Sequence, residues 1–350
     1  MTVDILEPSE IINNSTPFLN GVPKKLTKYA FHFTDVNNAA NILNHGKILS
    51  RNKALLKGVM INDNASREVI TGTNEYVHDY VRFYFRPKTP TQYHNEGIRA
   101  RDEIHPELQA HCPIPVFFLF DINKLLKKTN TYFSHESLAS HYEVPIYNYL
   151  NSYEEFTNAP FYHIYHYNSI PYEMPFEDRQ AIVKRRQAEI IVKDECDLVD
   201  LKRIYCRNIN ELETLKALLT PSVSEKYNDI IKVPKNPSCF FNNDYLQVRK
   251  VFFKDRQLFI KWKTNGRNNT LFNFRFKITE IDSEKEICNG KEFNYNPYNH
   301  NQQRIFWKTK AFLNDYSIVN LEIFLDNNLI YKKHHELDAD LISEICGLSY

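Results

Sequence analysis

RRQAEIIVKDE, residues Arg185–Glu195, is an apolar run with a carboxylate at its centre. Read as a β-strand, it alternates between two faces and turns three apolar side chains to the same side: Ala188, Ile190 and Val192. Glu189 points to the opposite side, together with Gln187 and Ile191. Periodicity alone makes Glu189 a solvent-facing carboxylate that pairs with a neighbouring arginine or protects a sheet edge. Other stretches of the chain decide between this interpretation and a functional one.

Length and composition indicate a folded protein of more than one domain. At 350 residues the chain is longer than most single domains, and we expect two. The hydrophobic fraction of 42% and the charged fraction of 25% are those of a globular protein. The formal net charge of +1 gives no strong overall field, so a polyanionic partner must be held by a local surface. The N-terminus lacks a signal pattern and no window resembles a membrane span, so we expect a cytoplasmic protein.

The cysteines are scattered along the chain without a CxxC pair, which argues against a zinc site. We expect reduced, mostly buried thiols, as is usual for an intracellular protein. The six residues are Cys112, Cys196, Cys206, Cys239, Cys288 and Cys346.

The first strong elements follow an N-terminal leader, residues 1–26, whose prolines predict irregular structure. YAFHFT, Tyr29–Thr34, is an aromatic alternating run typical of a strand. The residues that follow, DVNNAANILNHG, predict a short helix with Asp35 as its cap and Gly46 as its stop.

Two more strands are predicted in the first half of the chain. YVHDYVRFYF, Tyr76–Phe85, ends at the prolines of RPKTP. PIPVFFLFDI, Pro113–Ile122, is apolar on both faces and predicts a central strand covered on both sides, before helical spacing resumes at INKLLKK. The polar residues 50–75 suit a loop or short helices lying over a cleft.

The last third of the chain has a different pattern. KVPKNPSCFFNND, Lys232–Asp244, has the composition of a linker. Beyond it, five segments alternate like strands: VFFKDRQLFIKWKT, TLFNFRFKITEI, RIFWKTKAFL, SIVNLEIFL and NLIYKKH. Turns are expected at Lys254-Asp255 and Asn265-Gly266. Antiparallel strands at this density predict a small β-sandwich.

Three polar side chains upstream of Glu189 have ordinary interpretations when each is taken alone. His32, in FHFT, is typical of a hydrogen-bonded core histidine. Arg67, in NASREV, is typical of a surface arginine, and Tyr84, in RFYF, of a core tyrosine.

Taken together and in order, HFTDVNNAANIL, the arginine of ASREV, HDYVRFYFRPKTP and RRQAEIIV resemble the DarT family of nucleic-acid ADP-ribosyltransferases. These are toxins of toxin–antitoxin and phage-defence systems. The resemblance covers about residues 28–220. It implies an α+β protein with the ADP-ribosyltransferase fold, a split and mostly antiparallel β-core with helices, over residues 27–231. The β-rich residues 240–350 would form a sandwich-like domain after it.

The resemblance also assigns residues to the reaction. Glu189 would be the catalytic glutamate, and Arg67 would hold the pyrophosphate of NAD and support catalysis. NAD would be consumed as the ADP-ribose donor, without a metal. The residues that would contact it are His32, Thr34, Asn41, Arg67 and Tyr84.

The chemistry of the reaction asks for these residue types. Cleavage of the nicotinamide glycosidic bond passes through an oxocarbenium-like state, which a nearby carboxylate on a rigid strand stabilises. A bidentate arginine suits the charge of a pyrophosphate in a closed cleft. The same glutamate can take the proton of an acceptor base.

The acceptor would be met by the Tyr- and His-rich residues that precede Glu189. Aromatic faces stack on unpaired bases without net charge, and cations meet phosphates. An aromatic cover packed on the core is the other interpretation of this segment. The candidate acceptor-binding residues are Tyr162, His163, Tyr165, His166, Tyr167, Lys184, Arg185 and Arg186.

Several functions remain open at this point. The leading one is ADP-ribosylation of single-stranded nucleic acid, with residues 240–350 assisting substrate capture or binding an antitoxin. The resemblance makes thymidine or guanosine in single-stranded DNA the default acceptor. This chain departs from the family pattern, with Thr91-Gln92-Tyr93 where the family continues with Met-Leu and with a C-terminal region that the family generally lacks, so RNA is an alternative acceptor. Modification of a protein, NAD hydrolysis and a non-catalytic binding module are further alternatives. The absence of GxGxxG argues against a dehydrogenase, and a metal nuclease built from His163, His166 and Glu173 is weakly supported.

Overall fold

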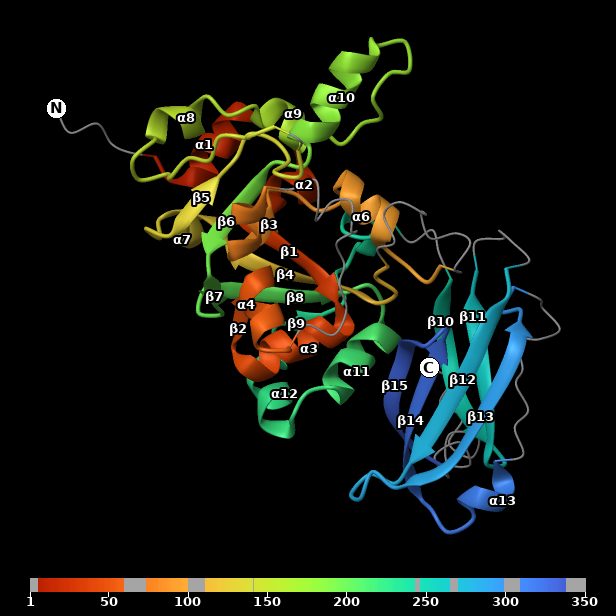
Figure 1. The fold of residues 1–350 in the computed structure, drawn as a ribbon. Helices are drawn as coiled ribbons and strands as arrows, with labels where there is room; N and C mark the ends of the chain where they lie inside the picture. Colours follow the sequence, from red (N-terminus) through yellow and green to blue (C-terminus); the bar gives the residue numbers. More distant parts are fainter. Residues whose placement is uncertain are drawn as a thin grey trace.

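The computed structural model describes residues 6–59, 74–99, 111–140, 142–242, 246–264, 270–298 and 309–337. The chain forms a mixed α/β part built on one large sheet, followed by a smaller part made almost wholly of strands (Figure 1). The expected fold class, a mostly antiparallel β-core with helices followed by an all-β region, is confirmed.

The large sheet has the strand order β5-β6-β3-β1-β4-β8-β9. Its strands pair antiparallel, except for the parallel pair β8–β9. β1 pairs with β4 along its whole length but shares only one register pair with β3, Phe31 with Tyr84, so the sheet is split there. The bounds are β1 (Tyr29–Asp35), β3 (Tyr80–Tyr84), β4 (Pro115–Asp121), β5 (Thr131–Phe133), β6 (Glu189–Lys193), β8 (Leu201–Cys206) and β9 (Ile231–Lys232), and a separate pair joins β2 (Lys47–Leu49) to β7 (Glu195–Asp197).

The helices around this sheet are short, and none in the described ranges is long and apolar enough to cross a membrane. They are α1 (Pro8–Ser15), α2 (Gly21–Leu26), α3 (Val36–His45), α4 (Arg51–Leu56), α6 (Pro90–Asn95), α7 (Ile122–Leu126), α8 (Tyr153–Thr157), α9 (Phe161–Tyr165), α10 (Phe176–Arg185), α11 (Ile209–Ala217) and α12 (Pro221–Tyr227). The described cysteines are free thiols, and Cys346 lies outside the described residues.

The passage from β1 into α3 confirms the first sequence prediction. The Asp35 carboxylate accepts a hydrogen bond from the Asn37 amide and so caps the helix. Gly46 ends it in the left-handed conformation, with φ of 73°, which glycine adopts without a steric penalty. The predicted central strand is also present as β4, whose residues are buried up to its last position.

The stretch around Glu189 is strand only in its second half. Residues up to Arg185 belong to α10, and β6 begins at Glu189 itself. The predicted alternation is nevertheless present, because Ala188, Ile190 and Val192 lie in the main hydrophobic core while Ile191 lies in a separate cluster on the other face.

Two expectations for the first half of the chain were wrong. The leader is not irregular: it contains α1 and α2, and Ile11 and Ile12 of α1 belong to the main core. The predicted strand Tyr76–Phe85 begins instead with a 3₁₀ turn, η1 (Glu75–Asp79), and only its second half is β3. The alternating apolar pattern extends through η1 because η1 and β3 each bury one apolar side, and Val77 is the buried residue of η1.

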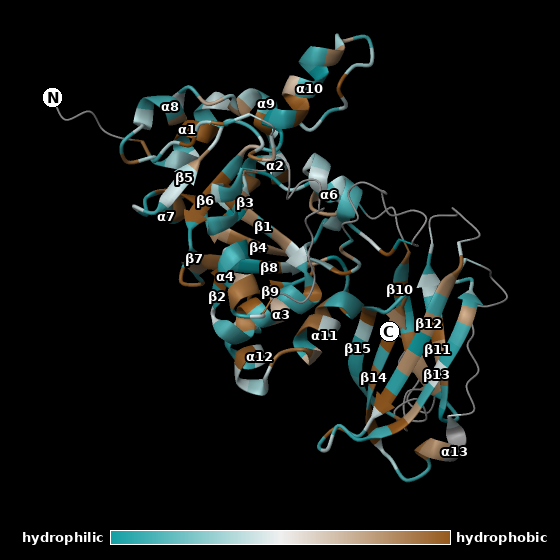
Figure 2. Ribbon diagram, in the orientation of Figure 1, coloured by the Kyte–Doolittle hydropathy of each residue, from teal (hydrophilic) through white to brown (hydrophobic). Residues whose placement is uncertain are grey.

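The C-terminal part contains two antiparallel sheets, β10–β11 and β13-β12-β14-β15. Their inward side chains share one hydrophobic core, in which Leu258 and Ile260 lie with Phe274 and Phe276, as predicted for a sandwich-like domain. Hydrophobic and hydrophilic residues alternate along these strands (Figure 2). The bounds are β10 (Gln247–Lys254), β11 (Gln257–Lys263), β12 (Phe272–Thr279), β13 (Glu286–Tyr295), β14 (Ile318–Leu325) and β15 (Asn328–Glu336).

Three details of this region differ from the prediction. The segment expected to be a strand at Arg304–Leu313 ends in a helix, α13 (Lys310–Leu313), and its first residues lie outside the described part. β13 was not predicted, because its exposed edge position leaves little apolar alternation. The hairpin turn after β10 is at Asp255-Arg256, both with positive φ, one residue later than expected; Asn265-Gly266 lies outside the described residues.

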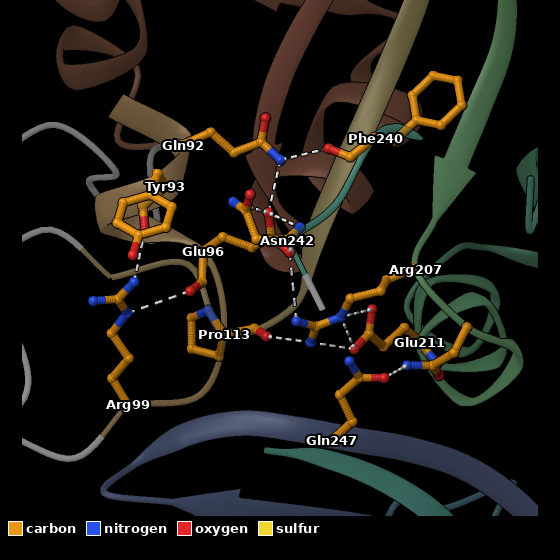
Figure 3. A network of polar contacts seen from close by, with 11 residues as sticks. Gln92, Tyr93, Glu96, Arg99, Pro113, Arg207, Glu211, Phe240, Asn242 and Gln247 are labelled. Atoms are coloured by element: carbon orange, nitrogen blue, oxygen red, sulfur yellow. Dashed lines mark hydrogen bonds and ion pairs between the residues drawn. The ribbon is translucent and has the colours of Figure 1, made fainter. Parts of the chain in front are cut away.

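The predicted linker is tied down rather than free. Phe240 and Phe241 pack on the large sheet with Phe31 and Phe117. The backbone carbonyl of Phe240 accepts a hydrogen bond from the Gln92 amide at 2.6 Å (Figure 3). The entry to the C-terminal part is therefore fixed against the mixed α/β part.

A buried charged network lies beside this entry (Figure 3). The Arg207 guanidinium donates from Nη2 to Glu211 Oε1 at 2.5 Å and to the Pro113 carbonyl at 3.2 Å. Glu96 Oε1 lies 3.7 Å from Arg207 Nη1 and accepts from the Asn242 backbone amide at 3.0 Å. The network thus joins α6, β8, α11 and the residues that lead into β10.

Candidate active site

The Glu189 carboxylate is held by three donors at the start of β6. Arg82 Nε lies 2.5 Å from Glu189 Oε2, and Arg82 Nη2 lies 2.6 Å from Oε1. The Leu138 backbone amide donates to the same Oε1 at 2.9 Å. Oε1 therefore has two donors and Oε2 has one, which leaves Oε2 able to accept a further hydrogen bond.

Strand pairing explains why this arginine meets this glutamate. In the register between β3 and β6, Glu189 lies opposite Tyr84 and Ile191 lies opposite Arg82. The four side chains share one face of the sheet, so the guanidinium reaches the carboxylate diagonally. Sequence reasoning missed Arg82. The available signal was a second charge in an apolar alternating run, YVRFYF, on the same face as Tyr84.

Burial distinguishes the two members of this pair. Glu189 has no exposed surface, whereas the Arg82 side chain is 27% exposed. Burial alone would lower the pKa of Arg82, but the adjacent Glu189 charge raises it overall, so the arginine is a permanent cation. Burial raises the pKa of Tyr84 to about 12, so its hydroxyl stays neutral. The site presents a fully buried, charge-paired carboxylate whose cationic partner is partly exposed.

His32 is joined to this pair through the backbone of Arg82. Its Nδ1 lies 2.9 Å from the Arg82 carbonyl oxygen, which can only accept. Burial lowers the pKa of His32, so the ring is neutral and carries its proton on Nδ1. Nε2 is then a hydrogen-bond acceptor. The rings of Phe83 and Phe118, with centroids 5.7 and 6.1 Å from that of His32, hold it in place.

The other predicted cofactor contacts lie around the same end of β1. Thr34 is buried on β1, two residues beyond His32. Asn41, on α3, donates from Nδ2 to the carbonyl of Val59 at 2.9 Å, just before the segment that contains Arg67. Arg67 itself lies outside the described residues.

A pocket of about 410 Å³ is lined partly by residues that are close in sequence to Tyr84 and Glu189, although neither of these two residues lines it. Arg86, Lys88 and Arg186 line it, and none of its lining residues is a carboxylate. Tyr93 and Tyr167 contribute aromatic faces, and the Arg86 guanidinium lies 3.8 Å from the centre of the Tyr167 ring. The pocket is therefore cationic and aromatic. It begins two residues after Tyr84 and three before Glu189.

Of the three residues that depart from the family pattern, Tyr93 alone is among the residues that line this pocket. Thr91 donates to the Gln187 side chain, two residues before Glu189, and Tyr93 lines the pocket. Gln92 instead points inward and bonds Glu96 at 2.7 Å.

The aromatic segment before Glu189 divides into buried and exposed residues. Tyr165 is fully buried in the main core, so its prediction as a base-stacking residue was wrong. Tyr162 is 54% exposed and contacts Phe18 and His166, with ring centroids at 5.1 and 5.3 Å.

The remaining candidates are half-buried. His163 contacts the ring of Tyr162, and Arg185 ends α10. Arg186 donates to the Asn168 carbonyl at 2.7 Å, and Lys184 lies 3.3 Å from the Tyr142 hydroxyl. In the described residues, no group of three or more His, Cys, Asp and Glu could hold a metal, so His163, His166 and Glu173 do not form one.

Comparison with known proteins decides the family. The model of the family described as ssDNA thymidine ADP-ribosyltransferase, DarT, matches residues 31–241. The chain belongs to the DarT family. It is thus an NAD-dependent ADP-ribosyltransferase of single-stranded DNA. No curated protein sequence matches the chain.

Solved structures of this family are also similar to the chain. Thermus sp. 2.9 DarT in complex with ADP-ribosylated ssDNA is 15% identical, with a TM-score of 0.46, and the match covers 61% of this chain and 97% of that one. The same protein in complex with NAD⁺ has 16% identity, a TM-score of 0.43, and coverage of 61% and 98%. Thermosipho africanus DarTG in complex with ADP-ribose has 14% identity, a TM-score of 0.44, and coverage of 68% and 56%.

Proposed function

We propose that this member of the DarT family transfers ADP-ribose from NAD to thymidine in single-stranded DNA, with Glu189 as the catalytic carboxylate. The observation that carries the proposal is the pair formed by Glu189 and Arg82, because it presents a buried carboxylate that is oriented by two hydrogen bonds from one guanidinium. We assign catalysis to residues 27–231. A role as a cytoplasmic toxin, acting where its DNA substrate lies, follows from the family.

The proposed reaction exchanges one glycosidic bond for another. The bond between nicotinamide and ribose C1′ breaks, nicotinamide leaves, and a nitrogen of the base bonds to C1′. The proton of that nitrogen passes to the Glu189 carboxylate. Before transfer, Glu189 Oε2 accepts a hydrogen bond from a ribose hydroxyl and so stabilises the positive charge on the sugar.

NAD fits the acceptors and donors of this site. His32 Nε2 is free to accept from a second hydroxyl because Nδ1 is engaged with the Arg82 carbonyl. Thr34 lies beside it on β1. Asn41 fixes the start of the segment that carries Arg67, the residue we propose for the pyrophosphate. Tyr84, whose hydroxyl is neutral, lies opposite Glu189 on the neighbouring strand β3.

Access to Glu189 requires a movement, since the carboxylate is fully buried. Arg82 is the partly exposed neighbour, so we propose that substrate enters along the Arg82 side chain. Arg82 then acts as a positioning residue that keeps the carboxylate aimed at the entrance.

The cationic and aromatic pocket lined by Arg86 and Arg186 is the proposed entry for the acceptor strand. Arg86, Lys88 and Arg186 match a phosphate, and Tyr93 and Tyr167 match a base. Arg186 and Tyr167 were predicted for this role from the sequence, and both line the pocket. An antitoxin remains a proposed partner of the same toxin.

A labelling experiment tests the proposal. The protein is incubated with labelled NAD and four acceptors: single-stranded DNA with one thymidine, the same strand without thymidine, RNA, and protein. We expect label only on the strand with thymidine. Glu189→Gln should abolish labelling, and the control Glu154→Gln, at an exposed carboxylate of α8, should not. Label on protein alone, NAD hydrolysis without transfer, or full activity of Glu189→Gln would each reject the proposal.

A further inference from the structure

The outward face of the β10–β11 hairpin is unusually basic. Val251 and Phe253 of β10, and Leu258 and Ile260 of β11, point into the sandwich core. The outward positions carry exposed cations, and neither strand contains an aspartate or a glutamate. The exposed cations are Arg249, Lys250, Lys254, Lys261 and Lys263.

Two of these lysines lie directly opposite each other. Lys250 pairs with Lys261 in the strand register, and like charges in this arrangement destabilise a sheet. Both ammonium groups lie over the ring of Phe252, at 5.1 and 5.8 Å from its centre. Phe252 in turn stacks on Phe259, with centroids 5.0 Å apart and planes at 8°. The aromatic pair therefore holds two cations side by side at a fixed place.

The described residues place no acidic side chain in an ion pair with these cations. On the other sheet, by contrast, Lys332 pairs with Glu322 at 3.0 Å. The net charge of the whole chain is only +1, so this face concentrates positive charge locally. A repulsive pair that is kept exposed fits an anionic ligand.

The hairpin is fixed relative to the catalytic part. Leu246, just before β10, forms a β-bridge with Ile98, which follows α6. Asn210, on α11, donates from Nδ2 to the Val248 carbonyl at 2.9 Å. The hairpin is thus joined to α6, whose Tyr93 lines the pocket, through the bridge between Leu246 and Ile98.

We propose that the outward face of β10–β11 binds the phosphates of the acceptor DNA strand, outside the catalytic pocket. This inference rests on the proposed function, and it gives the C-terminal part the task of substrate capture. The occupant is single-stranded DNA, because its phosphates match a face with five cations and no carboxylate, and because it is the substrate class of the family.

The test compares short and long strands. Affinity is measured by fluorescence anisotropy for oligonucleotides of about 6 nucleotides, too short to reach a second site, and of about 30. Lys250→Gln/Lys261→Gln should lower the affinity for the long strand about tenfold and leave the short strand unaffected. The slope of log K against log salt should become less negative by about 1.4, since each lost phosphate contact on single strands contributes about 0.7.

Matched controls separate this surface from general charge. Lys285→Gln/Lys291→Gln removes two exposed lysines, one just before β13 and one on it, and should leave affinity for the long strand unchanged. Phe252→Leu, which keeps the core but removes the ring under both lysines, should weaken the long strand severalfold. Equal affinity of the β10–β11 variant and the parent for long strands, or a loss confined to duplex DNA, would overturn the proposal.

The binding assay requires no catalysis, so its outcome is distinct from that of the proposed function. If Lys250→Gln/Lys261→Gln labels the short strand at the parental rate but has lost long-strand affinity, both proposals are supported. If strands are bound but none is ever labelled, the proposed function fails and the surface stands. Melting temperatures within a degree or two of the parent show that each variant is folded.

Discussion

Two arginine–glutamate pairs lie inside the mixed α/β part, and they differ in what surrounds them. Arg207 and Glu211 are both buried, with the arginine side chain at 0% exposure, and Glu96 lies on the far side of the guanidinium (Figure 3). Arg82 pairs with a glutamate that is just as buried, but the arginine itself is 27% exposed. One pair is sealed on all sides, and the other has one member in contact with solvent.

The hydrogen bonds of the two pairs show the same difference. Arg207 also donates to the Pro113 carbonyl, and Glu96 accepts from Gln92 and Asn242. These contacts join segments that are far apart in the sequence. Within the described part of the chain, by contrast, the Glu189 carboxylate accepts hydrogen bonds from Arg82 of β3 and from the Leu138 amide, and Oε2 keeps an unused acceptor position. A sealed pair stabilises the fold, whereas a pair with an open side can meet a substrate.

The largest expected effect is on the open pair. Glu189→Gln keeps the size of the side chain but removes the charge that stabilises the developing cation on the ribose. We expect the rate of transfer to fall by about 10²–10³-fold or more. The melting temperature should change little, because Arg82 can still be solvated. Single-turnover labelling and a thermal melt measure the two quantities, and a rate within a fewfold of the parent would contradict the assignment.

The sealed pair should respond in the opposite way. Arg207→Met leaves Glu211 and Glu96 buried without their cation, and we expect the protein to lose about 3–5 kcal/mol of stability. The urea midpoint measures this loss, and transfer per folded molecule should stay near the parental value. Arg203→Met, at an exposed arginine of β8, is the matched control. A large loss of activity in fully folded Arg207→Met would show that this pair also serves the reaction.

The sequence allowed one of these pairs to be predicted in part. Glu189 stood out because it interrupts an apolar run, and the positions of Ala188, Ile190 and Val192 followed from alternation. The β1–α3 unit followed from Asp35 and Gly46, since a cap and a stop are local signals. The partner of Glu189 depends instead on the register between β3 and β6, which are more than 100 residues apart.

The sealed pair left no signal that sequence reasoning could use. Glu96, Arg207 and Glu211 each resemble ordinary surface charges, and only tertiary packing buries them together. The same limit explains Tyr165, which is aromatic and near the site but lies in the core. The prediction of an irregular leader was wrong for a related reason, because α1 is stabilised by packing of Ile11 and Ile12 rather than by local periodicity.

Arg82→Lys sharpens the comparison by keeping the charge and removing the bidentate geometry. A lysine cannot bond both carboxylate oxygens in one plane, so Glu189 would lose orientation rather than charge pairing. We expect kcat to fall about tenfold, which corresponds to about 1.4 kcal/mol in the barrier. Arg203→Lys is the control. An unchanged kcat would show that the pair at β3 and β6 is structural, as the Arg207 pair is.

The smallest expected effect concerns pH, and it acts on the open pair alone through His32. Burial lowers the pKa of His32 from 6.5, so the imidazole of the folded protein stays mostly neutral from alkaline pH down to pH 6.5. In the unfolded chain His32 takes up a proton at its ordinary pKa of 6.5, whereas in the folded protein it does so only at the lowered pKa. The contribution of His32 to the free energy of unfolding is therefore fully present above pH 6.5 and is lost as the pH falls through the lowered pKa.

The proposed contact of His32 with NAD follows the same protonation. Nε2 accepts a hydrogen bond only while the ring is neutral, so kcat/KM for NAD should be level between pH 8 and 6.5 and fall a fewfold below the lowered pKa. His32→Gln, whose amide can still donate to the Arg82 carbonyl, should abolish this fall of kcat/KM at acid pH, the acid limb of the pH profile. Steady-state kinetics at several pH values, on protein shown to be folded at each, measure the effect. A limb that persists in His32→Gln would place the titrating group elsewhere, while a normal limb in Arg207→Lys would confirm that the sealed pair takes no part in it.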